Sequence, residues 1–493
     1  MRDNANGARL CLKDQPQHVR SVGRAFSRAG SSVALLHLLR LVLRTQSRSE
    51  FESLMTKFIF QCSNCGKRYQ RDEVRYLCPL CARDYRPGIP LIGVLSAEFD
   101  YGAIRRKFSK DRPDWNLFSA VEEKFHPPIP VGNTPFFRSV GLSKPFGFDN
   151  VWIKNDGLNP SASLKDRASF LVVAEATRLR EKTIVAASTG NAASALAAVC
   201  AAAGKRALIF VPQNAPKAKL VQMVLYGATV VPVRGTYDDA FRLSLEYTAK
   251  RGGLNRNTAY HPLTIEGKKT VGLEIWRQNN WRVPDAILVP VGDGVIISGV
   301  HKAFSDLKAA GLISRLPRLI CVQAEKSNAI HHYIESGIYR NAAHPDTVAD
   351  SISVSVPSNA HMARKAVLAS GGFSITVSDE EILQAQQMLA ARTGIFAEPA
   401  CSAVVAALKK LQGSKRLGRK AQIVLLVTGH GLKDVEAAMR NIQLPKAIEP
   451  TLADVEMYLA RLGLRRQSAA ATALLKSGVA LRLPPQSKKK GAH

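Results

Sequence analysis

The chain has 493 residues, enough for roughly two or three domains with a large hydrophobic core. Apolar residues make up 46% and charged residues 22%, which excludes a wholly disordered chain, a collagen and a protein that crosses a membrane many times. The net charge of +30 is spread along the chain with only 7% aromatic residues, so we expect a basic cytoplasmic enzyme with anionic ligands and neither a nucleic-acid nor a membrane partner.

The N-terminal segment differs from the rest in composition. Residues 1–50 carry nine Lys or Arg, three acids and several serines, a profile that is typical of an organelle transit peptide. The alternative is an over-extended reading frame, because Met55 stands just before the first cysteine pair, where a domain should begin. We expect Met55 to lie near the true start and residues 1–54 to be a disordered or mis-assigned extension.

Four of the eight cysteines form two Cys-x2-Cys pairs separated by twelve residues. They are Cys62, Cys65, Cys78 and Cys81. Two such pairs supply the four thiolates of a tetrahedral zinc, and the segment 55–90 is too short to build its own core, so the metal would supply its folding energy. Four cysteine ligands leave no open position for catalysis. Disulfides or a redox pair are the alternative, although no convincing secretory signal precedes the pairs.

From about residue 125, short apolar runs alternate with longer amphipathic stretches. The expected strands are Thr183–Ala187, Arg206–Pro212, Thr229–Val233, Ala286–Val291, Leu319–Gln323 and Gln422–Val427. The expected helices are Asn191–Ala203, Ala215–Tyr226, Asp238–Arg251, Glu380–Arg392 and Ala403–Leu411. This alternation predicts an α/β fold with parallel sheets covered on both faces. Residues 444–493 read as a C-terminal extension with weak helices and a basic tail, and Cys200, Cys321 and Cys401 read as core residues.

Ligands of such sheets bind where loops leave the carboxyl ends of strands, and three of these junctions stand out. In Asn159–Arg167, Ser163 is expected to cap a helix, and Lys165 would lie in its first turn, where the helix dipole lowers the pKa of an amine. Ala187–Ser194 offers free N–H groups and hydroxyls to an anion, and the glycines of Val289–Gly299 allow backbone to approach a phosphate. Taken singly, each junction has an ordinary structural explanation. The first could hold a solvated lysine, the second could be a capped turn, and the third could be a tight turn.

Together, these motifs resemble the threonine synthase family of fold type II pyridoxal-phosphate enzymes. The shared segments run in order from Cys62 to Asp434 and include Gly132–Pro135, Glu266–Thr270, Asp350–Ile352, Phe396–Ala400 and Thr428–Asp434. The resemblance implies that residues 91–443 form two doubly wound α/β lobes with pyridoxal 5'-phosphate between them, behind a zinc ribbon over residues 55–90. It also implies the conversion of O-phosphohomoserine and water to threonine and phosphate, and it leaves a homodimer open.

The same resemblance implies roles for individual residues. Lys165 would hold the cofactor covalently and move protons, Asn191 would bond the pyridine 3-oxygen, and Thr428 would meet the pyridine nitrogen. The cofactor phosphate would lie on Gly292, Asp293, Gly294, Val295 and Ile296. A phosphorylated amino-acid substrate would bind in a second anion pocket, for which the candidate residues are Asp166, Ser188, Thr189 and Lys269.

The chain departs from the usual family pattern at several positions. Ala162 stands where the family more often has glycine, and alanine is strained if that position requires a positive φ. Val295 and Ile296 replace hydroxyl or thiol residues, which removes donors and leaves Asp293 near an anion. An ammonia-lyase or β-replacement enzyme acting on a serine- or threonine-like amino acid is therefore an alternative. A non-enzymatic protein that binds RNA or protein through its ribbon and basic surface is another.

Overall fold

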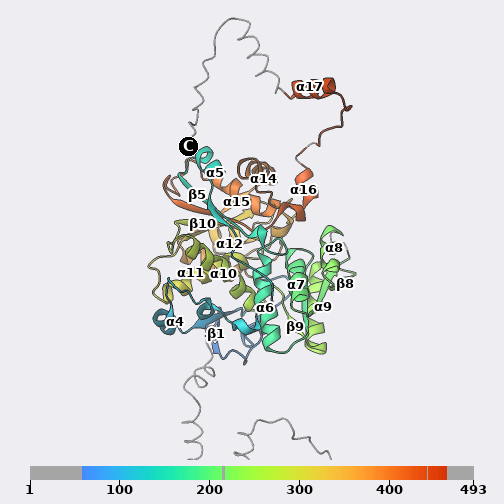
Figure 1. Ribbon diagram of the computed structural model, residues 1–493. Coiled ribbons are helices and arrows are strands. Elements are labelled where there is room, and N and C mark those ends of the chain that lie inside the picture. The colour runs from blue at the N-terminus through green and yellow to red at the C-terminus, as the bar shows by residue number, and fades with distance from the viewer. Residues whose placement is uncertain (1–57, 214–216, 441, 443, 463–493) are drawn as a thin grey trace, which may run out of the picture. The chain divides into compact units, whose positions relative to one another are not determined.

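The computed structural model describes residues 58–213, 217–440, 442 and 444–462 (Figure 1). The chain divides into a main unit up to Ala438 and a second unit that starts at Met439 and contains helix α17 (Leu452–Arg461). The expected N-terminal extension, the Met55 start and the end of the basic tail lie outside the described residues. Among the helices that are described, none is both long and apolar enough to cross a bilayer.

The larger of two parallel sheets has six strands in the order β12-β11-β10-β13-β5-β4. These strands are β12 (Phe373–Val377), β11 (Arg318–Ala324), β10 (Ala286–Pro290), β13 (Gln422–Val427), β5 (Asn150–Asn155) and β4 (Phe136–Arg138). Neighbours pair in parallel except β4, which runs antiparallel to β5. Along β10, Ala286 and Leu288 enter one hydrophobic cluster while Ile287 and Val289 enter another, so both faces are buried, as the apolar sequence predicts.

Helices cover both faces of this sheet. On one side lie α15 (Pro399–Lys410), α14 (Asp379–Thr393) and α5 (Val140–Ser143). On the other lie α10 (Leu263–Gln278), α11 (Val295–Ala309), α12 (Ala329–Ser336) and α13 (Ala360–Ala369). The short α16 (Val435–Met439) follows β13.

The smaller sheet has four parallel strands in the order β8-β7-β6-β9. They are β8 (Thr229–Val233), β7 (Arg206–Pro212), β6 (Thr183–Ala187) and β9 (Leu254–Asn255). The surrounding helices are α6 (Lys165–Arg178), α7 (Asn191–Ala202), α8 (Lys217–Leu225) and α9 (Tyr237–Arg251) (Figure 1). The two sheets with their helices form the two α/β lobes expected from the sequence.

The cysteine pairs belong to a small antiparallel sheet in the order β2-β1-β3. It consists of β1 (Phe58–Cys62), β2 (Arg68–Tyr69) and β3 (Leu95–Phe99), followed by α4 (Tyr101–Lys107). The sheet therefore continues beyond residue 90, where the ribbon was expected to end. Phe58, Phe60 and Leu95 are buried in the same hydrophobic cluster as helices of the two α/β lobes, which supply the core that the ribbon is too small to build.

The expected elements agree closely with the observed ones. Strands β6, β7, β8 and β13 have the predicted bounds, and the other helix and strand limits differ by one or two residues, except at α15. Helix α15 begins at Pro399 rather than Ala403, because a proline at the first helical position needs no N–H acceptor. Cys200, Cys321 and Cys401 are buried as predicted.

Candidate active site

A cavity lies at the carboxyl ends of β10 and β13, beside the first turns of α6, α7 and α11. Its walls come from both lobes. The lining residues are Lys165, Asn191, Thr258, Lys268, Pro290 to Ile297, Ser351, Ile352, Ala400 and Thr428. The cavity therefore occupies the edge at which parallel sheets bind ligands.

Lys165 is the first residue of α6 and is placed by the strand-like segment before it. The Leu164 N–H donates to the Thr428 carbonyl at 2.9 Å, and the His430 N–H donates to the Ala162 carbonyl at 3.0 Å. These bonds tie the start of α6 to the loop after β13. The pKa of Lys165 is lowered, mainly by burial, while Glu398 and Asp293 oppose the shift. The lowered pKa favours the neutral, nucleophilic amine.

The expected cap of this helix is absent. Leu164 occupies the N-cap position and makes no side-chain bond to the helix. The Ser163 hydroxyl is buried and has no hydrogen-bond partner among the described residues. The prediction that Ser163 caps α6 was wrong, because the segment pairs with Gly429 as a β-bridge and α6 begins only after it.

Asn191 is the first residue of α7, and its amide enters the cavity beside a carboxylate. Its Nδ2 donates to the two oxygens of Glu398 at 3.0 and 2.8 Å and to Ser351 Oγ at 3.2 Å. Its buried Oδ1 has no partner within the described chain. A Cβ on Gly429 would lie 1.9 Å from Glu398 Oε2, so only glycine there admits the carboxylate. Glu398 and Ser351 were not predicted as site residues; the only signal for them in the sequence is that each lies in a segment shared with the family.

The loop after β10 turns sharply into α11. Gly294 has a φ of 85° and is the N-cap residue of α11, and a Cβ on it would lie 2.8 Å from the Cβ of Ala363. The first residues of α11, Val295 and Ile296, are buried and apolar. The Asp293 carboxylate accepts bonds from Ser358 N at 3.3 Å and Ser358 Oγ at 3.2 Å. The loop thus offers an anion the free N–H groups of a helix N-terminus, without hydroxyl donors from residues 295 and 296.

Two further buried basic side chains accompany Lys165. Lys268 on α10 is 1% exposed, lines the cavity and, among the described residues, makes no hydrogen bond or ion pair. Burial chiefly lowers its pKa, with a further contribution from Lys165. Arg256 lies directly behind Thr258, to which its Nη1 donates at 3.1 Å, and its Nη2 has no partner in the described structure. Burial lowers the pKa of Arg256 to about 10.

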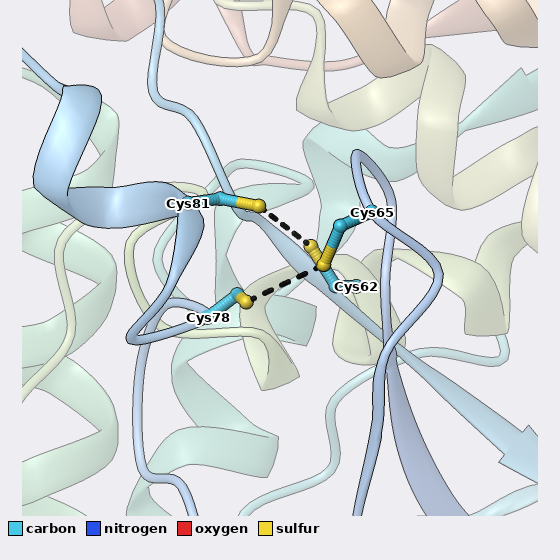
Figure 2. A group of neighbouring side chains, drawn as sticks. All are labelled: Cys62, Cys65, Cys78 and Cys81. Atoms are coloured by element: carbon cyan, nitrogen blue, oxygen red, sulfur yellow. Dashed lines mark hydrogen bonds between the residues drawn. The ribbon is translucent and has the colours of Figure 1, made fainter.

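A second cluster of functional side chains lies in the small antiparallel sheet. Figure 2 shows the sulfurs of Cys62, Cys65, Cys78 and Cys81 converging on one point. The Cys62 and Cys81 sulfurs are 3.8 Å apart, as are those of Cys65 and Cys78. Four sulfurs about 2.3 Å from one tetrahedral ion would be separated by about 3.8 Å. The cluster therefore has the dimensions of a metal site, and none of its cysteines forms a disulfide.

Comparison with known proteins identifies the family. Residues 129–429 match the family described as pyridoxal-phosphate dependent enzyme. The threonine synthase of Methanocaldococcus jannaschii is 35% identical over 404 residues, which cover 79% of this chain and 96% of the relative. The threonine synthase of Methanosarcina acetivorans is 34% identical over 400 residues, which cover 80% of this chain and 96% of the relative. The chain belongs to the threonine synthase family of pyridoxal-phosphate-dependent enzymes.

Solved structures of other enzymes share the fold. Maize serine racemase superimposes with a TM-score of 0.55 at 23% identity, covering 63% of this chain and 92% of the racemase. The threonine deaminase isoform 2 of Solanum lycopersicum superimposes with a TM-score of 0.54 at 22% identity, covering 63% of this chain and 88% of the deaminase. These matches confirm the fold type II architecture that the sequence motifs predicted.

The residues of the cavity fit the cofactor of this family. An amine, an amide and a glycine-lined helix N-terminus share the cavity. These groups match the aldehyde, the ring oxygen and the phosphate of pyridoxal phosphate. Thr428 also lines the cavity, and its neutral hydroxyl would suit the ring nitrogen. The predicted cofactor residues thus come together, and they are Lys165, Asn191, Gly292, Asp293, Gly294, Val295, Ile296 and Thr428.

Lys269 requires a correction. Its ammonium lies 3.0 Å from Asp306 Oδ2, pairs with Glu266 and stands 4.1 Å from the centre of the Phe99 ring. The Lys269 side chain therefore belongs to a buried cluster of ion pairs that packs against β3, and it does not line the cavity. Successive helix residues point about 100° apart, so Lys268 reaches the cavity instead.

The other three candidate substrate residues lie outside the cavity lining. The Asp166 carboxylate accepts bonds from the Ser161 N–H at 2.7 Å and from the Ser161 hydroxyl, and burial raises its pKa to about 6. Asp166 thus braces the loop before α6. Ser188 accepts a bond from Gly190 N at 3.2 Å within the turn that precedes α7. Substrate contacts from Ser188 and Thr189 stay predictions.

Ala162 has a φ of 63°, which confirms the strain expected from the sequence. Replacing Ala162 with glycine should raise the free energy of unfolding by about 1 kcal/mol, because a β-carbon is disfavoured in the left-handed region. Urea unfolding midpoints would measure the change. Ala168→Gly, inside α6, is the matched control and should lower stability by about 1 kcal/mol or more. A destabilising effect of both substitutions would contradict the prediction.

Proposed function

We propose that the protein converts O-phosphohomoserine and water to threonine and phosphate. The names of its relatives support this, and one feature of the site supports it independently. Two buried basic side chains, Lys268 and Arg256, lie near Lys165, and each has capacity for a further hydrogen bond to an anion. A cofactor phosphate accounts for one of them. A phosphorylated substrate brings a second phosphate, whereas serine or threonine does not.

The chemistry then follows from the cavity residues. Pyridoxal phosphate, when bound, supplies an electron sink for negative charge on substrate carbon. Lys165, with its lowered pKa, takes a proton from the α-carbon, gives it up, and then takes one from the β-carbon, and phosphate leaves from the γ-carbon. A proton is then delivered to the γ-carbon, which becomes the methyl group, and the α-carbon regains its proton when water has added. Asn191, held by Glu398, orients the ring. Water adds at the β-carbon only after phosphate has left, and the enclosed site excludes it before then.

The cysteine cluster in this proposal binds a structural zinc. All four ligands would be thiolates, so the ion has no open position and takes no part in the reaction. The sheet that carries the cysteines contacts Lys269 of α10 through Phe99, and Tyr101 of the following helix α4 donates a hydrogen bond to Asp306 of α11. The ribbon therefore acts as a cap on the catalytic body.

Incubation with O-phosphohomoserine tests the function. We expect threonine and inorganic phosphate to form in equal amounts, as measured by amino-acid analysis and a phosphate assay. The control is the same protein with threonine as substrate, which should release no ammonia. Ammonia without phosphate release would favour the ammonia-lyase alternative, and the absence of both products would contradict the proposal.

A further inference from the structure

The phosphate loop of this chain is short of positive charge and of side-chain donors. Val295, Ile296 and Ile297 line the cavity with apolar side chains, and Asp293 carries a negative charge beside it. The next hydroxyl, Ser298 Oγ, already donates to the Gly294 carbonyl at 2.8 Å and accepts from Asn359 Nδ2 at 2.9 Å. A phosphate monoester bears a charge near −2 at neutral pH, so backbone N–H groups alone would leave most of it uncompensated.

Lys268 stands on the helix that packs along this loop. Helices α10 and α11 lie side by side, and a Cβ on Gly299 would lie 2.8 Å from the Cβ of Lys268 (Figure 1). At the residue before Lys268, a Cβ on Gly267 would lie 2.3 Å from the Arg167 carbonyl of α6. Glycines thus bring α10 close to both α6 and α11. Lys268 leaves α10 between these two contacts and lines the same cavity as residues 290–297.

Lys268 has no ion-pair partner among the described residues, although the charge of Asp293 opposes the lowering of its pKa. Its side chain is 1% exposed, and within the described residues its ammonium has neither a hydrogen bond nor an ion pair. The adjacent Lys269 is fully used by Asp306 and Glu266. A buried amine without a partner is costly, and a ligand anion would remove that cost.

We propose that Lys268 binds the phosphate group of pyridoxal phosphate and takes the place of the hydroxyl donors that residues 295 and 296 lack. The proposal rests on the cofactor of the family and not on the identity of the substrate. A failure of the proposal would therefore leave the proposed reaction untouched. In this proposal Lys268 contacts only the phosphate end of the cofactor. Removal of its ammonium group should therefore weaken the binding of pyridoxal phosphate and not that of pyridoxal.

The test measures the affinity of the full-length, cofactor-stripped chain for pyridoxal phosphate and for pyridoxal. Lys268→Met keeps the length of the side chain and removes the charge. We expect it to weaken binding of pyridoxal phosphate by about 10- to 100-fold and to leave binding of pyridoxal unchanged, since a hydrogen bond to a charged group is lost. Lys268→Arg should restore most of the affinity, and Lys308→Met at the exposed end of α11 should change neither affinity.

Two results would overturn the proposal. Equal losses of affinity for pyridoxal phosphate and for pyridoxal would show that Lys268 acts on the ring or on folding. The melting temperature of Lys268→Arg would distinguish these two roles. Unchanged affinity for pyridoxal phosphate, together with a raised KM for O-phosphohomoserine, would place Lys268 at the substrate phosphate instead.

Discussion

Lys165→Ala is expected to abolish threonine formation, with a fall in kcat of at least about 10²- to 10⁴-fold, because the variant loses the proton carrier as well as the covalent link to the cofactor. Lys165 begins α6 within the cavity, and its pKa is lowered by burial. Steady-state kinetics and the visible spectrum of the variant would measure both losses.

Lys165→Ala should change how the cofactor is held without preventing its binding. The phosphate loop, Asn191 and Lys268 are intact in Lys165→Ala, so the variant should still bind pyridoxal phosphate without a covalent bond. Dialysis should therefore strip the cofactor more readily than from the unchanged protein. Lys268→Met is the matched control, since it removes a second lysine of the same cavity and should keep the covalent link. Retained turnover in Lys165→Ala would contradict the assignment.

Cys62→Ser is expected to abolish binding of the zinc that we propose at the cysteine cluster and to lower the free energy of unfolding by about 5 kcal/mol or more, because metal binding would be coupled to folding of the ribbon. Three remaining thiolates cannot complete the tetrahedral site. Zinc analysis should find about one ion per chain in the unchanged protein and much less in the variant. Thermal unfolding should show a lower midpoint.

The matched control for this substitution is Cys200→Ser. Cys200 is buried in α7, outside the metal cluster, so the same atom is exchanged without touching a ligand. Its zinc content should equal that of the unchanged protein. An unchanged melting temperature and zinc content in Cys62→Ser would rule out a structural ion at this cluster.

Local patterns in the sequence were sufficient for much of this structure. The cysteine cluster follows from two short knuckles, each defined by its own spacing, and β6, β7, β8 and β13 follow from short apolar runs. The position of Lys165 at a helix start follows from the loop that precedes it. In each case the determining residues lie within about a dozen positions of one another along the chain.

The remaining features depend on contacts between distant segments. Which of Lys268 and Lys269 reaches the cavity depends on the face that α10 turns toward α11, and Gly267 and Gly299 set that face by close packing. Ser163 could not be separated from a helix cap without its bridge to Gly429. Tertiary packing decides which lysine faces the cavity and whether Ser163 caps the helix, and local sequence propensity carries no information about that packing.

The most direct measurement of the central claim is borohydride reduction of the protein loaded with pyridoxal phosphate, followed by peptide mass mapping. Two lysines, Lys165 and Lys268, line the cavity, so the mapped position is informative. We predict that the reduced adduct lies on Lys165 alone. An adduct on Lys268 or on any other lysine, or a protein that takes up no cofactor, would contradict the account.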